Sequence, residues 1–173
     1  MEGPERSGPF SMSDCPVPVC YDRAMTDVRF YHLTRKTLEQ SLPELLEKTL
    51  ERGWRAVVLA ASEERAEALA QHLWTWKPDS FLPHGTARDG HPARQPVFLS
   101  ATDERPNDAN VLFLVDGAET ARAPEYERVC DLFDGNDPDA LAAARQRWRT
   151  AKAAGHALQY WQQGDRGGWE QKA

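Results

Sequence analysis

Residues 54–74, WRAVVLAASEERAEALAQHLW, decide the fold class, because they place a helix directly after a buried strand. The stretch 54–60 is nearly continuous in apolar residues, which is typical of a strand covered on both faces of its sheet. Ser62 can then cap a helix whose apolar residues recur at helical spacing as far as Trp74. A strand followed at once by a helix is half of the unit that builds parallel sheets.

The same alternation of strand and helix continues on both sides of this stretch. Gly53 and Gly155 mark two helix ends, and Asp137 followed by Pro138 is the pattern of a helix cap and first helical residue. The order of elements predicts a single three-layer α/β domain with a mainly parallel sheet. We predict strands at 28–33, 54–60, 97–100, 111–115, 129–133 (the weakest) and 156–161, helices at 38–52, 62–74 and 138–154, and a loop at 77–96.

The two terminal segments differ from this regular part. Residues 1–24 are rich in Pro, Ser and Gly, show no periodicity and contain no apolar run typical of a signal peptide. We interpret them as a disordered extension or as sequence upstream of a functional start at Met25, and the residues leave both interpretations open. The Gly-rich segment 164–173 is expected to be a flexible tail. The folded domain is therefore predicted to span 25–163.

Composition and charge exclude several classes of protein. The 173 residues are 40% hydrophobic and 28% charged, as in an ordinary globular domain. The longest apolar runs, at 56–61 and 111–115, are too short to cross a membrane. The formal net charge of −6 argues against a protein that coats nucleic acid, although a local basic patch is compatible with it. Composition therefore favours a protein partner over a DNA partner.

The motifs of nucleotide-binding and hydrolytic enzymes are missing from the sequence. There is no Gly-x-Gly-x-x-Gly, no Gly-Lys-Ser/Thr and no Gly-x-Ser-x-Gly. The turns after Leu33 and Ala60 read TRKT and ASEE, without the glycines that let a backbone close around phosphate. Cys15, Cys20 and Cys130 lack metal-ligand spacing. We therefore expect a Rossmann-like domain without a phosphate-binding loop, a cofactor or a metal.

Two polar residues occupy positions where α/β proteins often place function. Asp116 follows the predicted strand at 111–115, and His84 lies in the loop segment FLPHG. No second group with suitable spacing accompanies either residue. We therefore interpret Asp116 as a turn residue and His84 as a loop residue that is hydrogen-bonded locally.

The last predicted helix carries the most informative pattern. Its apolar stripe, which should face the sheet, consists of Leu141, Ala144, Trp148 and Ala151. Along one border of this stripe, at i, i+4 and i+7, lie the cations Arg145, Arg149 and Lys152. No acid between Ala140 and Ala154 neutralises them. This arrangement suits an acidic peptide with an apolar end, although the cations would also complement the helix dipole without binding anything.

Four segments of the regular part share their order and spacing with a known family. They are FYHL at 30–33, LW at 73–74, SFLPH at 80–84 and ARQRWRTAKAAG at 144–155. With them, residues 26–162 resemble the DNA polymerase III chi subunit family. The resemblance implies a single α/β domain that serves as a non-catalytic accessory subunit of the bacterial holoenzyme, in the cytoplasm at the replisome.

The resemblance also implies two protein partners. Chi subunits pair with the small psi subunit, which tethers them to the clamp loader, and they bind the acidic C-terminal tail of the single-stranded-DNA-binding protein. DNA is then contacted mainly indirectly. Trp74 and Phe81 match aromatic positions of the family and would be additional partner contacts. Leu141 stands where some relatives carry a cation, which weakens the site. The implied tail site consists of Arg145, Trp148, Arg149 and Lys152, with Phe133 as an apolar wall.

Two other functions stay open on the residues alone. The first is an enzyme on an α/β nucleotide-binding fold, which would need a phosphate cradle or an activated nucleophile. The second is a protein that binds single-stranded nucleic acid directly through the cations at 145–152. The overall negative charge opposes this second function.

Overall fold

An eight-stranded sheet forms the centre of the computed structural model, which describes residues 26–79, 82–166 and 168–172. The strand order is β3-β4-β2-β5-β6-β1-β7-β8, and neighbouring strands are parallel except β7 and β8. The predicted α/β class and mainly parallel sheet are confirmed. The elements are β1 (Asp27–Leu33), α2 (Leu38–Glu51), β2 (Ala56–Leu59), α3 (Glu63–Thr75), β3 (Gly85–Thr86), β4 (Val97–Ser100), β5 (Val111–Leu114), β6 (Arg128–Asp134), α4 (Pro138–Ala153), β7 (Ala157–Gln163) and β8 (Trp169–Gln171), with the 3-10 segments η2 (Ala87–Asp89), η3 (Pro92–Arg94) and η4 (Ala123–Glu125).

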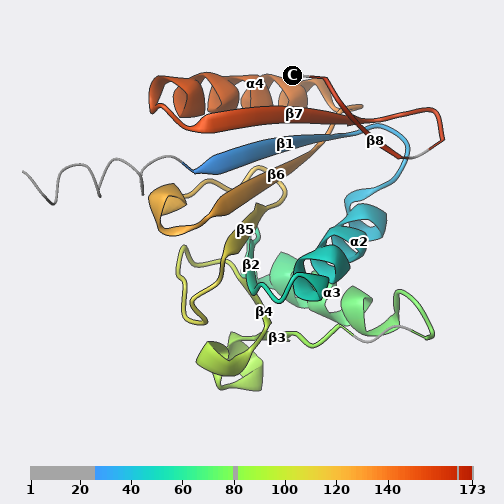
Figure 1. Cartoon of the computed structure of the whole chain (residues 1–173). Helices are drawn as coiled ribbons and strands as arrows, with labels where there is room; N and C mark the ends of the chain where they lie inside the picture. The colour runs from blue at the N-terminus through green and yellow to red at the C-terminus, as the bar shows by residue number, and fades with distance from the viewer. Residues whose placement is uncertain (1–25, 80–81, 167, 173) are drawn as a thin grey trace, which may run out of the picture.

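The helices lie on opposite faces of the sheet. In Figure 1, α2 and α3 lie together, whereas α4 lies beside β7 at the other end of the sheet. The α2 and α3 core contains Val58, and the α4 core contains Val57. Successive side chains of a strand point to opposite faces, so these two cores are separate layers. The connections from β1 to β2 and from β2 to β3 run in one direction along the sheet, and the connection from β6 to β7 runs in the other. Because crossover connections are right-handed, helices in connections of opposite direction lie on opposite faces of the sheet.

Strand β1 contributes side chains to both layers. Phe30 belongs to the α4 core, and Tyr31 belongs to the α2 and α3 core. The strand pairs in parallel with β6 on one side and β7 on the other. In this register Phe30 lies opposite Tyr160, and His32 lies opposite Phe133. Aromatic residues from three strands therefore meet beside the middle of α4.

The helix ends follow the local signals in the sequence. The Ser62 side chain accepts a hydrogen bond from the backbone N–H of Arg65 at 3.1 Å, and the Asp137 side chain accepts one from Asp139 at 3.0 Å. Gly155 has a φ of 86°, the left-handed conformation that favours glycine after a helix end. The predicted caps of α3 and α4 are therefore confirmed.

Three segments differ from the predictions. The segment 164–173, predicted to be a flexible tail, contains β8, which pairs antiparallel with β7. The ring of Trp169 packs against Tyr31 with 4.9 Å between centroids, so apolar contact holds β8 on the sheet, a strand that the sequence did not predict. The weakest predicted strand, 129–133, is confirmed and is longer than predicted, forming the seven-residue β6 inside the sheet. The predicted loop 77–96 contains β3, η2 and η3.

Some sequence predictions fall outside the described residues. These are the N-terminal extension 1–24, the cysteines within it, and Phe81. Cys130 is a buried free thiol, and burial raises its pKa to about 12. A thiol in this environment stays protonated at neutral pH. Within the described ranges, no helix is long and apolar enough to cross a membrane, and no group of acids, histidines and cysteines is arranged to hold a metal ion.

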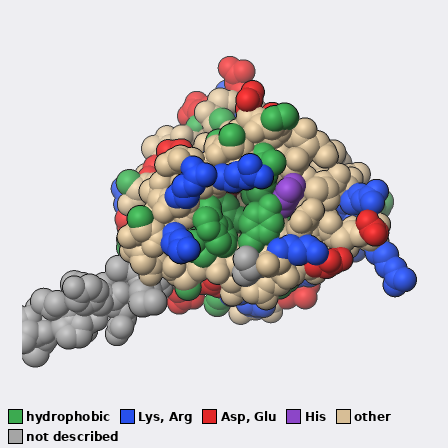
Figure 2. Space-filling view, turned by 90° about the horizontal axis from the view of Figure 1, so that it is seen from above, with side chains coloured by type: hydrophobic (Ala, Val, Ile, Leu, Met, Phe, Trp, Pro, Cys, Tyr) green, Lys and Arg blue, Asp and Glu red, His purple; other side chains and the backbone are tan. Residues whose placement is uncertain are grey.

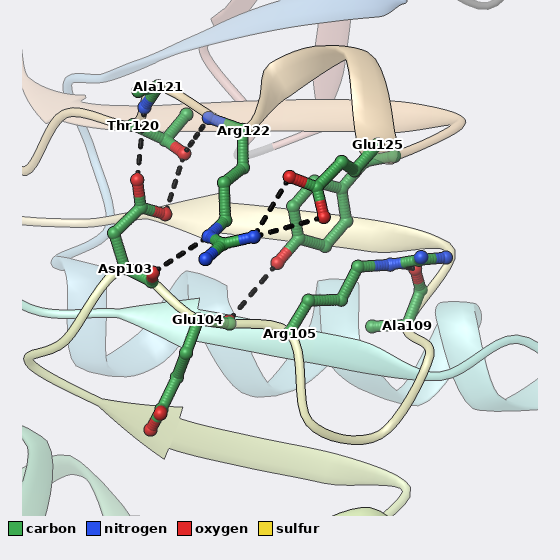
Figure 3. Close-up of polar contacts among 9 residues, drawn as sticks. Asp103, Glu104, Arg105, Ala109, Thr120, Ala121, Arg122 and Glu125 are labelled. Carbon is green, nitrogen blue, oxygen red and sulfur yellow. Dashed lines mark hydrogen bonds and ion pairs between the residues drawn. The ribbon is translucent and has the colours of Figure 1, made fainter.

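Hydrogen bonds join the loops that follow β4 and β5 (Figure 3). The Asp103 carboxylate accepts hydrogen bonds from Thr120 Oγ1 at 2.8 Å and from the Ala121 N–H at 3.0 Å. Arg122 Nε donates to the Asp103 carbonyl at 2.9 Å, and the same guanidinium pairs with Glu125 at 3.0 Å. Residues of these loops pack on the α4 core, so the loops cover a part of that face to which α4 does not extend.

Candidate binding site beside α4

A pocket of about 300 Å³ opens between α4 and the strands β1, β6 and β7. It forms because α4 starts just after β6 and crosses the neighbouring strand β1 to reach β7. Ala144, which is small and buried, lies where the helix meets the sheet. The lining comes from all four elements and consists of Phe30, Phe133, Leu141, Ala144, Arg145, Trp148, Arg149 and Tyr160.

Aromatic rings form the apolar wall of this pocket. The Trp148 ring lies edge-to-face against Phe30 and Tyr160, with centroids 5.3 Å and 6.1 Å away. Phe133 is buried, and its ring centroid is 6.4 Å from that of Tyr160. Ring pairs in these orientations contribute stability beyond their buried area. The pocket therefore has a preformed wall against which an apolar side chain can pack.

Exposed cations border the pocket, and its described lining contains no carboxylate. Arg145 and Arg149 line it, and Lys152 lies on α4 one turn after Arg149. Figure 2, seen from the side of α4 and β7, shows apolar side chains surrounded by Lys and Arg side chains, with a His beside them. Positive charge around an apolar hollow suits a ligand that combines carboxylates with an apolar group.

Arg147 differs from the neighbouring arginines of α4. It forms two hydrogen bonds with the Asp131 carboxylate of β6, one of them from Nη2 to Oδ1 at 3.0 Å. The side chains of Arg147 and Asp131 are only 11% and 3% exposed. A bidentate pair of this kind fixes α4 on the sheet and leaves the ligand-facing charge to the exposed arginines.

His32 extends the edge of the pocket. Its Nδ1 is hydrogen-bonded to the Tyr160 hydroxyl, and its ring centroid is 5.2 Å from that of Phe133. Burial lowers the pKa of His32, and the charge of Arg145 lowers it further. The imidazole is therefore neutral at neutral pH, near the positive charge of Arg145.

The structure brings together most of the predicted tail-site residues. Leu141, which stands in place of a further cation, adds an apolar side chain to the same pocket. The sequence reasoning missed Phe30, His32 and Tyr160, which come from β1 and β7. The alternation of side chains along β1 is the signal that places His32 on the same face as Phe30. Of the predicted residues, Lys152 lies beside the pocket, and the four that line it are Phe133, Arg145, Trp148 and Arg149.

The two additional predicted contact residues are not part of this pocket. Trp74 lies on α3, on the opposite face of the sheet from α4, and it is 52% exposed. Its ring packs on His84 with 4.5 Å between centroids. Phe81 lies outside the described residues. Trp74 therefore belongs to a second surface.

A larger crevice of about 700 Å³ lies between the starts of α2 and α4, at the carboxyl ends of β1 and β6. In doubly wound α/β folds such a crevice often receives nucleotides. Here the Gln163 Oε1 accepts hydrogen bonds from the backbone N–H groups of Thr34, Arg35 and Lys36, at 3.0, 2.8 and 2.9 Å. The turn after β1 therefore uses its N–H groups inside the protein, where a phosphate-binding loop would direct them to a ligand.

Asp116 and His84 have the local roles that the sequence predicts. Asp116 and Gly117 have φ values of 55° and 79°, as in a turn, and the Asp116 carboxylate pairs with Arg65 at 2.5 Å. The two ring nitrogens of His84 lie 2.6 and 2.9 Å from backbone carbonyl oxygens. The turn role of Asp116 is confirmed, and His84 is hydrogen-bonded locally to Leu82 and, in addition, to Ala70 of α3.

Fold and site together define a class of protein, an α/β domain with an apolar pocket bordered by cations. Its turn after β1, where related folds bind phosphate, directs its N–H groups to Gln163 instead. Residues 25–159 match the family model described as "DNA polymerase III chi subunit, HolC". The chain belongs to the DNA polymerase III chi subunit family. Members of this family are non-catalytic accessory subunits of the polymerase, in agreement with the expected absence of catalytic residues.

Three curated relatives are described as chi subunits, one of them as a probable one. The chain is 27% identical over 109 residues to the probable DNA polymerase III subunit chi of Rickettsia prowazekii (strain Madrid E), a match that covers 63% of this chain and 66% of that protein. It is 27% identical over 138 residues to the DNA polymerase III subunit chi of Pseudomonas aeruginosa, covering 78% and 95%. It is 25% identical over 142 residues to that of Escherichia coli (strain K12), covering 78% and 96%.

Proposed function

We propose that this chain links the clamp loader, through the psi subunit, to the single-stranded-DNA-binding protein during DNA replication in the cytoplasm. DNA is then contacted mainly through that protein. The observation that carries the proposal is the pocket beside α4, where Trp148 and Phe133 form an apolar wall next to exposed Arg145 and Arg149. An acidic tail that ends in an apolar residue has the complementary chemistry.

Each part of such a tail has a counterpart in the pocket. Carboxylates pair with Arg145 and Arg149, because a guanidinium can bind a carboxylate with two parallel hydrogen bonds. The terminal apolar side chain packs against Trp148. His32 lies at the pocket edge, where its Nδ1 is hydrogen-bonded to the Tyr160 hydroxyl. The contact is small, so we expect an affinity of about micromolar, and its charges make the affinity sensitive to salt.

Trp74 supports a second partner contact on another face. Large exposed apolar side chains are typical anchors of protein interfaces. Because α3 and α4 lie on opposite faces of the sheet, a partner on α3 leaves the pocket beside α4 accessible. This geometry suits an adaptor that holds two proteins at once.

The test is a titration with a fluorescently labelled peptide copied from the last residues of the single-stranded-DNA-binding protein of the same organism. Fluorescence anisotropy should show saturable binding that weakens as salt is added. Two matched peptides serve as controls, one without the terminal apolar residue and one with its acids replaced by their amides. We expect both to bind less tightly. Equal binding of all three peptides, or none at low salt, would refute the proposed tail site.

A further inference from the structure

A second basic surface lies on the face of the sheet opposite the pocket beside α4. It is a groove of about 190 Å³ between the end of α2 and the strands β5, β6, β1 and β7. Its floor includes Tyr31 and Phe113, which belong to the α2 and α3 core. The two pockets therefore lie on opposite faces of the same sheet.

The charge of this groove is opposite to that of the whole chain. Its lining includes four cations, Arg29, Lys48, Arg52 and Arg128, and its described lining has no carboxylate. By contrast, five carboxylates and four cations line the crevice at the carboxyl ends of the strands. The chain as a whole has a net charge of −6. Four cations gathered at one hollow of an acidic protein form a local anion-binding surface.

One half-buried carboxylate, that of Asp27, positions two of these cations. Arg29 Nε and Arg128 Nε donate to the same Asp27 Oδ2, at 3.0 and 3.1 Å. A single carboxylate offsets only one of the two positive charges. Because Asp27 is bound through Nε of each arginine, it does not use their terminal nitrogens. The pair is held in place and still carries an excess positive charge.

Tryptophan rings position the guanidinium groups of this groove. Arg52 and Arg128 lie over the Trp54 ring, with guanidinium carbons 5.7 and 5.2 Å from its centroid. Arg29 lies over the Trp161 ring at 5.9 Å. Indole rings and the guanidinium groups held over them are both surfaces on which unpaired nucleobases stack.

We propose that this groove binds single-stranded nucleic acid. Lys48 and the three arginines contact consecutive phosphates, and a base stacks on Trp54 or on a guanidinium plane beside it. A duplex presents its phosphates but keeps its bases stacked inside, so it would not use the aromatic part of the groove. An acidic peptide would use the cations but offers no planar bases. The inference goes beyond the proposed function, because it gives the chain its own contact with the strand.

The experiment titrates the full chain with an oligothymidylate of about 15 nucleotides, roughly the span of one single-strand-binding domain. Tryptophan fluorescence and the anisotropy of a labelled oligonucleotide are both recorded. We expect the bound bases to quench tryptophan emission and a duplex of equal length to bind more weakly. Lys48 and Arg52 are exposed, so the double variant Lys48→Ala/Arg52→Ala should fold normally. It should bind oligothymidylate about tenfold more weakly at low salt, with the slope of log affinity against log salt shallower by about 1.4.

Two charge-matched double variants complete the design. Arg88→Ala/Arg94→Ala removes two exposed cations outside both pockets and should leave the binding of oligonucleotide and tail peptide unchanged. Arg149→Ala/Lys152→Ala should weaken only the binding of the tail peptide. Lys48→Ala/Arg52→Ala should weaken only the binding of the oligonucleotide. Failure of the tail site would therefore be visible separately from failure of the groove. Three results would overturn the inference. They are an equal loss of oligonucleotide binding in all three variants, tighter binding of an acidic peptide than of the oligonucleotide at the groove, and the absence of tryptophan quenching by the oligonucleotide.

Discussion

The Gln163 side chain joins the end of β7 to the first turns of α2, because its Nε2 lies 3.2 Å from the Ser41 hydroxyl oxygen. The oxygen of the same amide group holds the three N–H groups of the turn after β1. Gln163 is itself buried. One side chain from the last parallel strand therefore fills the position at which related folds direct backbone N–H groups to a phosphate.

Gln163→Ala should lower the free energy of unfolding by about 1–3 kcal/mol, the usual cost of leaving buried hydrogen-bonding groups without a partner. Urea unfolding followed by circular dichroism measures the change. Gln162→Ala, at the adjacent and partly exposed position, is the matched control and should change stability by less. Equal effects of the two substitutions would show that the Gln163 hydrogen bonds contribute little to stability.

Arg145→Ala should weaken binding of the tail peptide by about 1–3 kcal/mol, the range for central anchors of an interface. Its loss should also flatten the salt dependence of binding, because one attractive charge is removed. Anisotropy titrations at several salt concentrations measure both effects. If the folded variant binds as tightly as the wild type, the tail site lies elsewhere.

Trp148→Ala should also weaken binding of the tail peptide by about 1–3 kcal/mol. The loss should be the same at every ionic strength, because the lost contact is apolar. Trp148 packs against Phe30 and Tyr160, so the substitution also costs stability. Circular dichroism must therefore accompany the titration. Trp148→Phe keeps an aromatic wall and should restore most of the affinity. A Phe variant as weak as the Ala variant would argue against simple apolar packing.

Affinity for the tail peptide should rise as the pH falls from 7.5 to 6. Burial and Arg145 lower the pKa of His32, against the opposing effects of the Gly135 carbonyl and Asp134. The free pocket therefore holds a neutral imidazole, and a bound carboxylate beside it would raise the pKa and favour proton uptake. Tail carboxylates, with ordinary pKa values near 4, stay ionised over this range. We expect a gain of about two- to fivefold.

His32→Gln should abolish that pH dependence, and an unchanged pH profile in this variant would exclude His32 as its source. The same lowered pKa affects stability. The unfolded chain binds a proton more readily than the folded chain, so the contribution of His32 to stability is present above its ordinary pKa of 6.5 and is lost as the pH falls through the lowered value. Folding should therefore be verified at each pH.

Arg147→Met should destabilise the fold by about 3–5 kcal/mol, because it leaves the Asp131 carboxylate buried without its partner. The double variant Arg147→Met/Asp131→Leu should recover most of the loss, since it removes both charges together. Urea unfolding of the single and double variants measures the difference. A double variant as unstable as Arg147→Met would show that packing at this position matters more than the charge pair.

Periodicity and capping signals predicted the main elements because those elements are determined locally. The helix end at Gly155 and the helix cap at Ser62 each depend on a few adjacent residues. The short strands β3 and β8 were missed because their residues have no strand pattern of their own. β8 exists through its pairing with β7 and through the contact of Trp169 with Tyr31, which are both tertiary interactions.

The candidate site was predictable only as far as one helix extends. Helical spacing placed Arg145, Trp148 and Arg149 on neighbouring faces of α4, and the structure has them at one pocket. The other wall depends on the register between β1 and β7, which sets Phe30 opposite Tyr160. No local sequence pattern indicates that β1 and β7 are neighbours in the sheet. The hydrogen bond between His32 and Tyr160 could therefore not be predicted.

Strand β1 directs Phe30 and His32 toward α4, and Arg29 and Tyr31 toward the opposite face. Inserting or deleting a single residue within this strand would exchange the two sets, since the side-chain period is two. Such an insertion or deletion of one residue would remove both binding surfaces, even though every charged residue on α2 and α4 would be unchanged. We expect members of the lineage to vary in length at their loops and termini and to keep the length of this strand constant.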